Sequence, residues 1–141
     1  MKLKDIMTTE VEVIRPDDTL QIAAQKMRNR DIGFLPVCDG ERLVGALSDR
    51  DITVRAIAEG LDPKNTRVKE VVHSRVIWCF DDQSVSAAVK KMKENQVRRL
   101  IVIHHENKQL AGVVSLGDLA NNSTEKISSS VLLSVSSPLP E

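Results

Sequence analysis

An internal repeat limits the possible folds of this 141-residue chain more than any other property. Residues 17–37 align with residues 82–102, and residues 43–52 align with residues 110–119. The matched residues include Ala23 with Ala88, Met27 with Met92, Leu35 with Leu100 and Val37 with Val102. Two copies of about 65 residues are too few for a solenoid, which needs at least three. The repeat therefore predicts two similar units related by a pseudo-twofold axis.

Each copy contains the spacing of an amphipathic helix. Apolar residues recur at i, i+3, i+4 and i+7, which places them on one helical face. They are Leu20, Ala23, Ala24 and Met27 in the first copy and Val85, Ala88, Val89 and Met92 in the second. Thr19 and Ser84 precede these runs at the N-cap position. A second helix is expected to start at Ser48 and end at Gly60, a typical C-cap residue, and its counterpart starts at Ser115.

Short strands are predicted around these helices. They cover residues 10–15, 34–38 and 42–47 in the first copy and residues 75–80, 100–104 and 110–114 in the second. Each unit therefore has the order β-α-β-β-α, and the chain is predicted to be an α/β protein of the α+β type whose two units pack through their sheets. The expected division is residues 1–65, residues 66–121 and a serine-rich tail, residues 122–141. For the tail, a frayed terminus and a short helix that docks on a partner subunit are both open.

Composition argues against several classes of protein. Lys and Arg number 20, as do Asp and Glu, so the chain is not suited to neutralising nucleic-acid phosphates. Phe34, Trp78 and Phe80 are too few aromatic residues for a base-stacking surface. The longest apolar run, residues 76–80, is far too short to span a membrane, and the first ten residues lack the apolar stretch of a signal peptide. The two cysteines make no disulfide framework, so we expect a cytoplasmic protein.

The most specific local pattern is Gly-x-x-Ser-x-x-Asp at the end of a strand, which occurs twice. The copies are GALSDRD, starting at Gly45, and GVVSLGD, starting at Gly112. Such a pattern is typical of a capping box, in which a serine and an acidic residue three positions later satisfy the amides at a helix start. The same geometry also suits a ligand, because a helix start attracts phosphate and a carboxylate accepts hydrogen bonds from ribose hydroxyls. The two interpretations are compatible.

The duplicated unit with its paired motif resembles a tandem pair of cystathionine β-synthase (CBS) domains, the Bateman module. The resemblance covers about residues 1–121, and the stretches DIGFLPVCDGERLVGALSDRDI and EGLDPKNT are similar to small stand-alone bacterial CBS-pair proteins, including the hypoxic-response type. It implies clefts between the two units that bind adenosine-containing ligands, and a disc-shaped homodimer. AMP, ADP or ATP are the expected ligands, ahead of S-adenosylmethionine or NAD(H), and no obligatory cofactor is implied.

The resemblance also implies roles for individual residues. Asp51 and Asp118 would hold ribose hydroxyls, and Ser48 and Ser115 would lie beside the phosphate or ribose. Two basic residues before the second-copy strand, Arg98 and Arg99, match a position where the family contacts phosphates; a solvated strand edge is the alternative. The first copy has Gly33 and Phe34 there, although Arg50 could compensate. We therefore expect unequal sites, with asymmetric or single occupancy.

Other reactive residues carry weaker signals. His73, His104 and His105 lack the spacing of a zinc site, so no metal site is predicted. Cys38 and Cys79 are interpreted as small buried apolar residues, with a redox-sensing thiol as the alternative. No serine or cysteine motif indicates an activated nucleophile, so catalysis is not expected.

The prediction for function is a non-enzymatic module that senses adenine nucleotides and signals to an unknown protein partner by changing conformation. The alternative is a ligand-free dimeric structural or interaction protein of a stress response.

Overall fold

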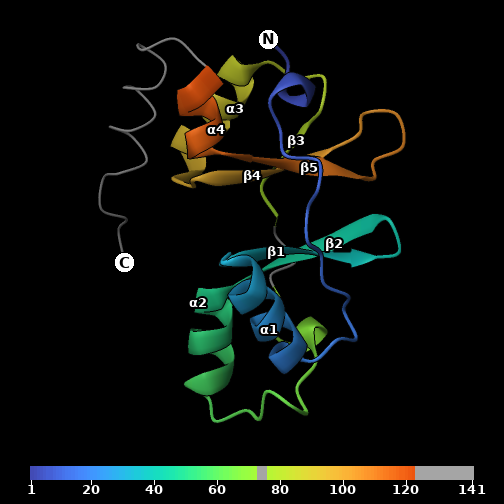
Figure 1. Cartoon of the computed structure of the whole chain (residues 1–141), viewed down its shortest axis with the longest axis vertical. Helices are drawn as coiled ribbons and strands as arrows, with labels where there is room; N and C mark the ends of the chain where they lie inside the picture. The colour runs from blue at the N-terminus through green and yellow to red at the C-terminus, as the bar shows by residue number, and fades with distance from the viewer. Residues whose placement is uncertain (73–75, 123–141) are drawn as a thin grey trace. The chain divides into compact units, whose positions relative to one another are not determined.

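The chain forms two compact units, each containing one of the sequence repeats. The computed structural model describes residues 1–72 and 76–122 (Figure 1). The first-repeat unit consists of Glu12–Val76, and the second-repeat unit combines Met1–Val11 with the described residues from Ile77 onward. Within each unit, both main helices lie on the same face of the sheet (Figure 1). The predicted α+β class is confirmed.

The first-repeat unit is built on a two-stranded antiparallel sheet. Its elements are α1 (Leu20–Arg30), β1 (Phe34–Asp39), β2 (Arg42–Ser48), α2 (Asp49–Asp51), the π-helix η2 (Ile52–Ile57) and the 3-10 helix η3 (Val68–Glu70). The helix expected after Ser48 is therefore one short α-helical turn that widens into a π-helix. In η2 the Ala58 amide donates to the Thr53 carbonyl, and the chain ends this helical stretch at Gly60 with φ +75°. The positive φ fits the predicted C-cap glycine.

The second-repeat unit is built on a three-stranded sheet in the order β3-β4-β5. Its elements are η1 (Leu3–Asp5), β3 (Trp78–Phe80), α3 (Val85–Asn95), β4 (Arg99–Ile103), β5 (Leu110–Ser115) and α4 (Leu116–Asn122). β3 is parallel to β4, and β4 is antiparallel to β5. The segment that corresponds to β3 in the first repeat makes a single bridge, from Ile14 to Val37, because Pro16 follows and cannot donate to a strand. The strand predicted over residues 10–15 is therefore reduced to this bridge.

The predicted N-caps are confirmed in both repeats. The Thr19 hydroxyl accepts a hydrogen bond from the Ile22 amide (3.3 Å), and the Ser84 hydroxyl accepts one from the Ala87 amide (3.1 Å). Both helices also end alike, with Asp31 and Gln96 in the left-handed region at φ 52° and 49°. The repeat in sequence is thus a repeat in backbone conformation, including its unusual positions.

The segment that precedes each repeat in sequence packs in the core of the other repeat. The Leu3 amide donates to the Gln83 carbonyl (2.9 Å), and Thr8 exchanges two hydrogen bonds with Val113 (2.9 and 3.0 Å). Leu3 is fully buried in the second-repeat core, and its counterpart Val68 is fully buried in the first-repeat core. The compact units therefore differ from the predicted division between residues 65 and 66, because these hydrogen bonds and apolar contacts join each segment to the other repeat.

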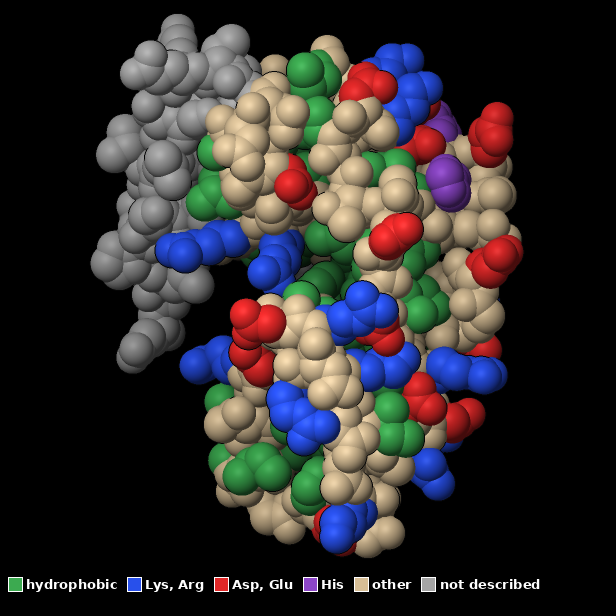
Figure 2. Space-filling view, in the orientation of Figure 1, with side chains coloured by type: hydrophobic (Ala, Val, Ile, Leu, Met, Phe, Trp, Pro, Cys, Tyr) green, Lys and Arg blue, Asp and Glu red, His purple; other side chains and the backbone are tan. Residues whose placement is uncertain are grey.

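The cores are aliphatic, and the surface drawn in Figure 2 is mixed in charge. Apart from Cys38, Cys79, Met27 and Met92, the buried apolar side chains are Leu, Ile, Val and Ala. Acidic and basic side chains are interspersed on the visible face (Figure 2), as their equal numbers suggest. Among the described residues, no helix has the length and apolar character needed to cross a membrane.

Candidate functional site

The first-repeat motif forms a reciprocal capping box at the end of β2. The Asp51 amide donates to the Ser48 hydroxyl (3.0 Å), and the Ser48 amide donates to Oδ2 of Asp51 (2.8 Å). Asp51 is one of two polar side chains in the described chain that are buried, at 9% exposure. Its carboxylate is thus held by the backbone at the strand end before any ligand is considered.

The second-repeat motif repeats this arrangement at the end of β5. The Asp118 amide donates to the Ser115 hydroxyl (3.1 Å), and the Ser115 amide donates to Oδ2 of Asp118 (2.9 Å). The capping-box interpretation is therefore confirmed in both copies. Each unit therefore has one Ser-x-x-Asp pair, whose hydroxyl and carboxylate are held in place at the equivalent strand end.

The strand register brings the predicted phosphate contacts to the second-repeat motif. Arg99 is the Cα partner of Ser115 at the first pair of the β4–β5 ladder. The adjacent Arg98 accepts a backbone hydrogen bond at its carbonyl from Leu116 (2.8 Å). Both arginine side chains are exposed. One end of the second-repeat sheet thus carries two exposed arginine residues and the Ser115–Asp118 box.

The equivalent end of the first-repeat sheet has the opposite charge. Phe34 is the Cα partner of Ser48, and the Asp49 amide donates to the Gly33 carbonyl (2.9 Å). A Cβ atom on Gly33 would lie 2.7 Å from Oδ2 of Asp49, so this carboxylate occupies the space beside Gly33. Asp49 was not among the predicted site residues; its signal in the sequence is an acidic residue where the second motif has Leu116.

Arg50, which could compensate for the missing arginines, lies next to Asp49 in the chain. Its side chain is exposed, and its amide donates to Oδ1 of Asp49 (2.8 Å). Arg50 is therefore the next residue in the chain after Asp49, whose carboxylate lies beside Gly33. Its predicted phosphate contact remains a prediction.

Both cysteines are free and buried, as their sequence context predicted. Burial raises the pKa of the Cys38 thiol. Burial also raises the pKa of the Cys79 thiol, and the nearby Lys91 opposes this shift only in part. Since the thiolate is the reactive form, these environments favour inert, space-filling thiols.

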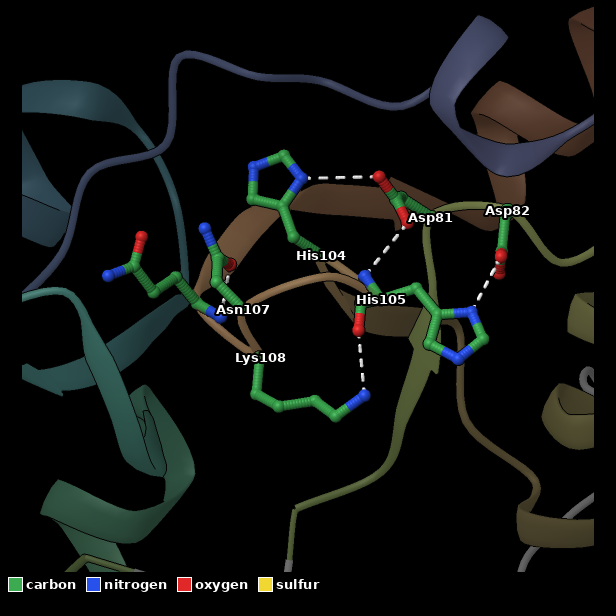
Figure 3. A network of polar contacts seen from close by, with 7 residues as sticks. Asp81, Asp82, His104, His105, Asn107 and Lys108 are labelled. Carbon is green, nitrogen blue, oxygen red and sulfur yellow. Dashed lines mark hydrogen bonds and ion pairs between the residues drawn. The ribbon is translucent and has the colours of Figure 1, made fainter.

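A polar network joins the β4–β5 turn to the loop after β3 (Figure 3). Nδ1 of His104 lies 3.2 Å from Oδ2 of Asp81, and the His105 amide donates to Oδ1 of Asp81 (3.1 Å). Nδ1 of His105 lies 2.6 Å from Oδ2 of Asp82, and its ring stacks on Phe80 with centroids 4.4 Å apart. His104 and His105 thus connect two loops.

The stabilising contribution of Asp81 to the second-repeat unit should be lost at acidic pH. Burial raises the pKa of its carboxyl, but hydrogen bonds from His105 and His104, with the charges of His104 and Lys4, outweigh burial and lower the pKa below its ordinary value of 3.8. A carboxyl with a lowered folded-state pKa stabilises the fold above its unfolded pKa, and this contribution disappears as the pH falls through the folded value.

The variant Asp81→Asn tests this effect. We expect wild type to be more stable than the variant at pH 6, by up to about 1 kcal/mol for such partly exposed pairs, and the difference to vanish below the pKa of Asp81. Urea unfolding between pH 6 and pH 2.5 measures it. A difference that is constant over this range would contradict the assignment.

The described residues contain no metal site of the usual kind. No group of three or more His, Cys, Asp or Glu side chains within residues 1–72 and 76–122 is arranged to hold a metal ion. Asp81 and Asp82 are instead paired one to one with the two histidines. His73 lies outside the described residues, as does the tail from residue 123 onward.

Comparison with known proteins identifies the repeat. The sequence matches the CBS domain family over residues 3–56 and 68–125. It is 36% identical over 137 residues to Hypoxic response protein 1 of Mycobacterium tuberculosis (strain H37Rv), covering 96% of this chain and 94% of that protein. The predicted resemblance to a stand-alone CBS pair is therefore confirmed.

Two solved structures share this architecture. A crystal structure of Hypoxic Response Protein I with two coordinated zinc ions has a TM-score of 0.80 and 37% identity, covering 88% of this chain and 100% of that one. The CBS domain pair of protein MJ0100, in complex with 5′-methylthioadenosine and S-adenosylmethionine, has a TM-score of 0.73, covering 86% and 94%. At 22% identity, the second likeness shows the fold alone.

Proposed function

The chain belongs to the CBS-domain family, and on that basis we propose that it is a regulatory module whose second-repeat motif binds an adenine nucleotide. The observation that carries the proposal is the register of β4 and β5, which sets Arg99 opposite Ser115. Asp118, held by the capping box, lies at the same strand end. The CBS pair of MJ0100, which has the same fold, was crystallised with two adenosine compounds.

Each residue would supply a different contact. The guanidinium groups of Arg98 and Arg99 would hold the phosphate, since arginine forms charge-assisted, bidentate hydrogen bonds with it. The Asp118 carboxylate would accept hydrogen bonds from the ribose hydroxyls, and the Ser115 hydroxyl would contact the ribose or phosphate. AMP, ADP or ATP would fit these groups. They bind and orient a ligand, and we assign them no catalytic role.

Signalling would follow from a shift between conformations. A ligand changes the equilibrium only through its different affinities for the two states, so the nucleotide must favour one of them. A protein partner would then recognise that state.

We also propose that the protein forms a homodimer. The exposed large apolar side chains of the described residues, other than Met1, all belong to the first-repeat unit: Ile22, Val54, Ile57 and Leu61. Burying such residues against a second copy removes apolar surface from water. This supports self-association through the helical side of that unit.

Isothermal titration calorimetry with AMP, ADP and ATP tests the nucleotide site. We expect Arg99→Ala to weaken AMP binding by about tenfold or more, because a hydrogen bond to a charged group contributes about 1.5–3 kcal/mol. Adenosine binding should change little, since adenosine has no phosphate. Asp118→Ala should weaken the binding of both AMP and adenosine. It should also lower the melting temperature, because the helix cap is lost.

Lys90→Ala is the matched control, because Lys90 is an exposed cation on α3 that should contact no nucleotide. Equal affinity of wild type and Arg99→Ala for AMP would contradict the phosphate assignment. Unchanged affinity of Asp118→Ala would contradict the ribose assignment.

The capping boxes themselves favour one alternative function. Because Ser48–Asp51 and Ser115–Asp118 have a structural role without any ligand, the chain could be a dimeric interaction protein of a stress response whose motifs stay empty. A dimer in solution whose thermal stability changes with none of the nucleotides would support that function.

A further inference from the structure

We propose that the β4–β5 turn is held by a pH-sensitive link, in which protonation of His104 and His105 ties the turn to the loop after β3 and deprotonation loosens it. The link consists of two acid–histidine pairs, His104 with Asp81 and His105 with Asp82 (Figure 3). All four residues belong to the second-repeat unit. They lie at the end of β4 and β5 opposite to the Ser-x-x-Asp motif, so the inference is independent of the proposed nucleotide site.

The geometry of the two imidazole rings carries the inference. Nδ1 of His104 lies 3.2 Å from Oδ2 of Asp81, and Nδ1 of His105 lies 2.6 Å from Oδ2 of Asp82. A carboxylate can only accept, so each contact is a hydrogen bond only when Nδ1 carries a proton. The protonated ring always has that proton, whereas the neutral ring has a single proton that either nitrogen can hold. Protonation therefore completes each hydrogen bond and also turns it into an ion pair.

The surroundings of His105 add to this effect. Its ring stacks on Phe80, with centroids 4.4 Å apart and planes at 15°. A charged imidazole in this position is a cation over an aromatic face, which is an attractive contact. The His105 amide also donates to Oδ1 of Asp81 (3.1 Å), so the backbone and side chain of one residue contact both carboxylates.

The other charged groups near the pairs come from the N-terminal segment and from the turn itself. They are the α-amino group of Met1, Lys2, Lys4 and Asp5 in the first and Glu106 and Lys108 in the second. The Lys4 amide donates to the Asp81 carbonyl (3.0 Å), and Nζ of Lys108 donates to the His105 carbonyl (2.7 Å). The first turn of α3 has no charged side chain. The ammonium groups oppose a charged imidazole, but the two carboxylates are its direct partners and outweigh them.

The first repeat shows that the fold does not require these pairs. The residues at the equivalent positions, 65 residues earlier, are Pro16, Asp17, Asp39 and Gly40. β1 and β2 are nevertheless joined by a short turn, which uses Gly40 at φ 62°. The two histidines are therefore an addition to one repeat and not a requirement of the hairpin.

The two kinds of group set the pH range of the link. Although burial raises the pKa of the Asp81 carboxyl, hydrogen bonds from His105 and His104 and the charges of His104 and Lys4 lower it below 3.8. This carboxylate thus stays charged in the range from about pH 5 to 8, where the charge of histidine ordinarily changes. The contribution of the pairs is therefore present at about pH 5.5 and is reduced as the pH rises to about 8. This range is separate from the acid effect tested with Asp81→Asn.

Exchange of amide protons with water, measured by NMR on the ¹⁵N-labelled full chain and expressed as protection factors, tests the inference. The His105 and Lys108 amides are the reporters, because they donate to Asp81 and to the His104 carbonyl. We expect their protection to fall about twofold to tenfold between pH 5.5 and pH 8, the size expected for two partly exposed ion pairs. The β1–β2 turn has no histidine, so the Arg42 amide should keep its protection.

The double variant His104→Gln/His105→Gln removes both titrating rings and keeps amide donors for the two carboxylates. The histidine side chains are 44% and 55% exposed, so this variant should fold. Its turn should have the same protection at both pH values, although the α-amino group of Met1 is retained. Glu106→Gln is the matched control, since it removes a charge from an exposed position of the same turn. It should keep the pH dependence of wild type.

Three outcomes would overturn the inference. The first is equal protection of the turn amides at both pH values in wild type. The second is an unchanged pH dependence in the double histidine variant, because another group would then be responsible. The third is a parallel loss of protection at Arg42 and at Leu100 in β4, which would report a loss of stability throughout the chain. No nucleotide is present in this experiment, so the result does not depend on the proposed nucleotide site.

Discussion

Replacing Leu3 with alanine should lower the free energy of unfolding of the second-repeat unit by about 2–5 kcal/mol, the usual cost of removing a fully buried leucine side chain. Leu3 precedes the first repeat in sequence, yet its side chain is completely buried in the core that contains Met92, Leu100 and Leu119. The loss combines transfer of its methyl groups to water with the cavity left behind.

Hydrogen exchange and urea unfolding measure this effect. Amides of β4 and β5 should exchange faster in Leu3→Ala than in wild type, because the core beneath them is weakened. Met1→Ala is the control: Met1 is 69% exposed, so its replacement should change stability by less than about 0.5 kcal/mol. Equal effects of the two substitutions would show that the first residues of the chain do not pack in this unit.

Replacing Gly112 with alanine should destabilise the same unit by about 1–3 kcal/mol through overpacking. A Cβ at this position would collide with the Thr8 carbonyl oxygen, and it would lie only 3.1 Å from the Met7 sulfur. The obstacle is backbone, so it can move only by weakening the two hydrogen bonds between Thr8 and Val113. Differential scanning calorimetry should show a lower melting temperature, and the Thr8 amide should lose protection from exchange.

Gly117→Ala provides the matched control for Gly112→Ala. Its added Cβ would meet only the Ser115 hydroxyl, at 3.6 Å, and alanine is a better helix former than glycine. We expect Gly117→Ala to be neutral or slightly stabilising. The double variant Leu3→Ala/Gly112→Ala should lose less stability than the sum of the single variants, since both act on the N-terminal segment. If the stability losses of the two single variants add exactly in the double variant, the close contact between Gly112 and the N-terminal segment is contradicted.

Periodicity made the helices and caps of this fold predictable. The apolar spacing after Thr19 and Ser84 is local, and each hydroxyl caps its own helix three residues later, so a short stretch of sequence contains all the information needed. The Ser-x-x-Asp boxes are local in the same sense. Duplication strengthened both inferences, because two copies of a pattern are harder to explain by chance than one.

The N-terminal segment and the charge around each motif were not predictable in this way. Leu3 precedes the first repeat but packs in the second-repeat core, and Val68 precedes the second repeat but packs in the first-repeat core. No local sequence pattern indicates this pairing. The carboxylate of Asp49 lies against Gly33 only because β1 and β2 pair in one register, which brings residues sixteen positions apart into contact. The π-helix after Asp51 was not predicted either, since residues 52–57 show no distinctive spacing.

Residue spacing within each copy was enough to predict the duplication, the main helices, their caps and the family. The copy that each connecting segment completes, and the residues that meet at each strand end, follow only from the folded arrangement. These depend on strand register and on contacts between residues far apart in the chain, which place different charged residues beside two motifs that share only their Gly, Ser and Asp.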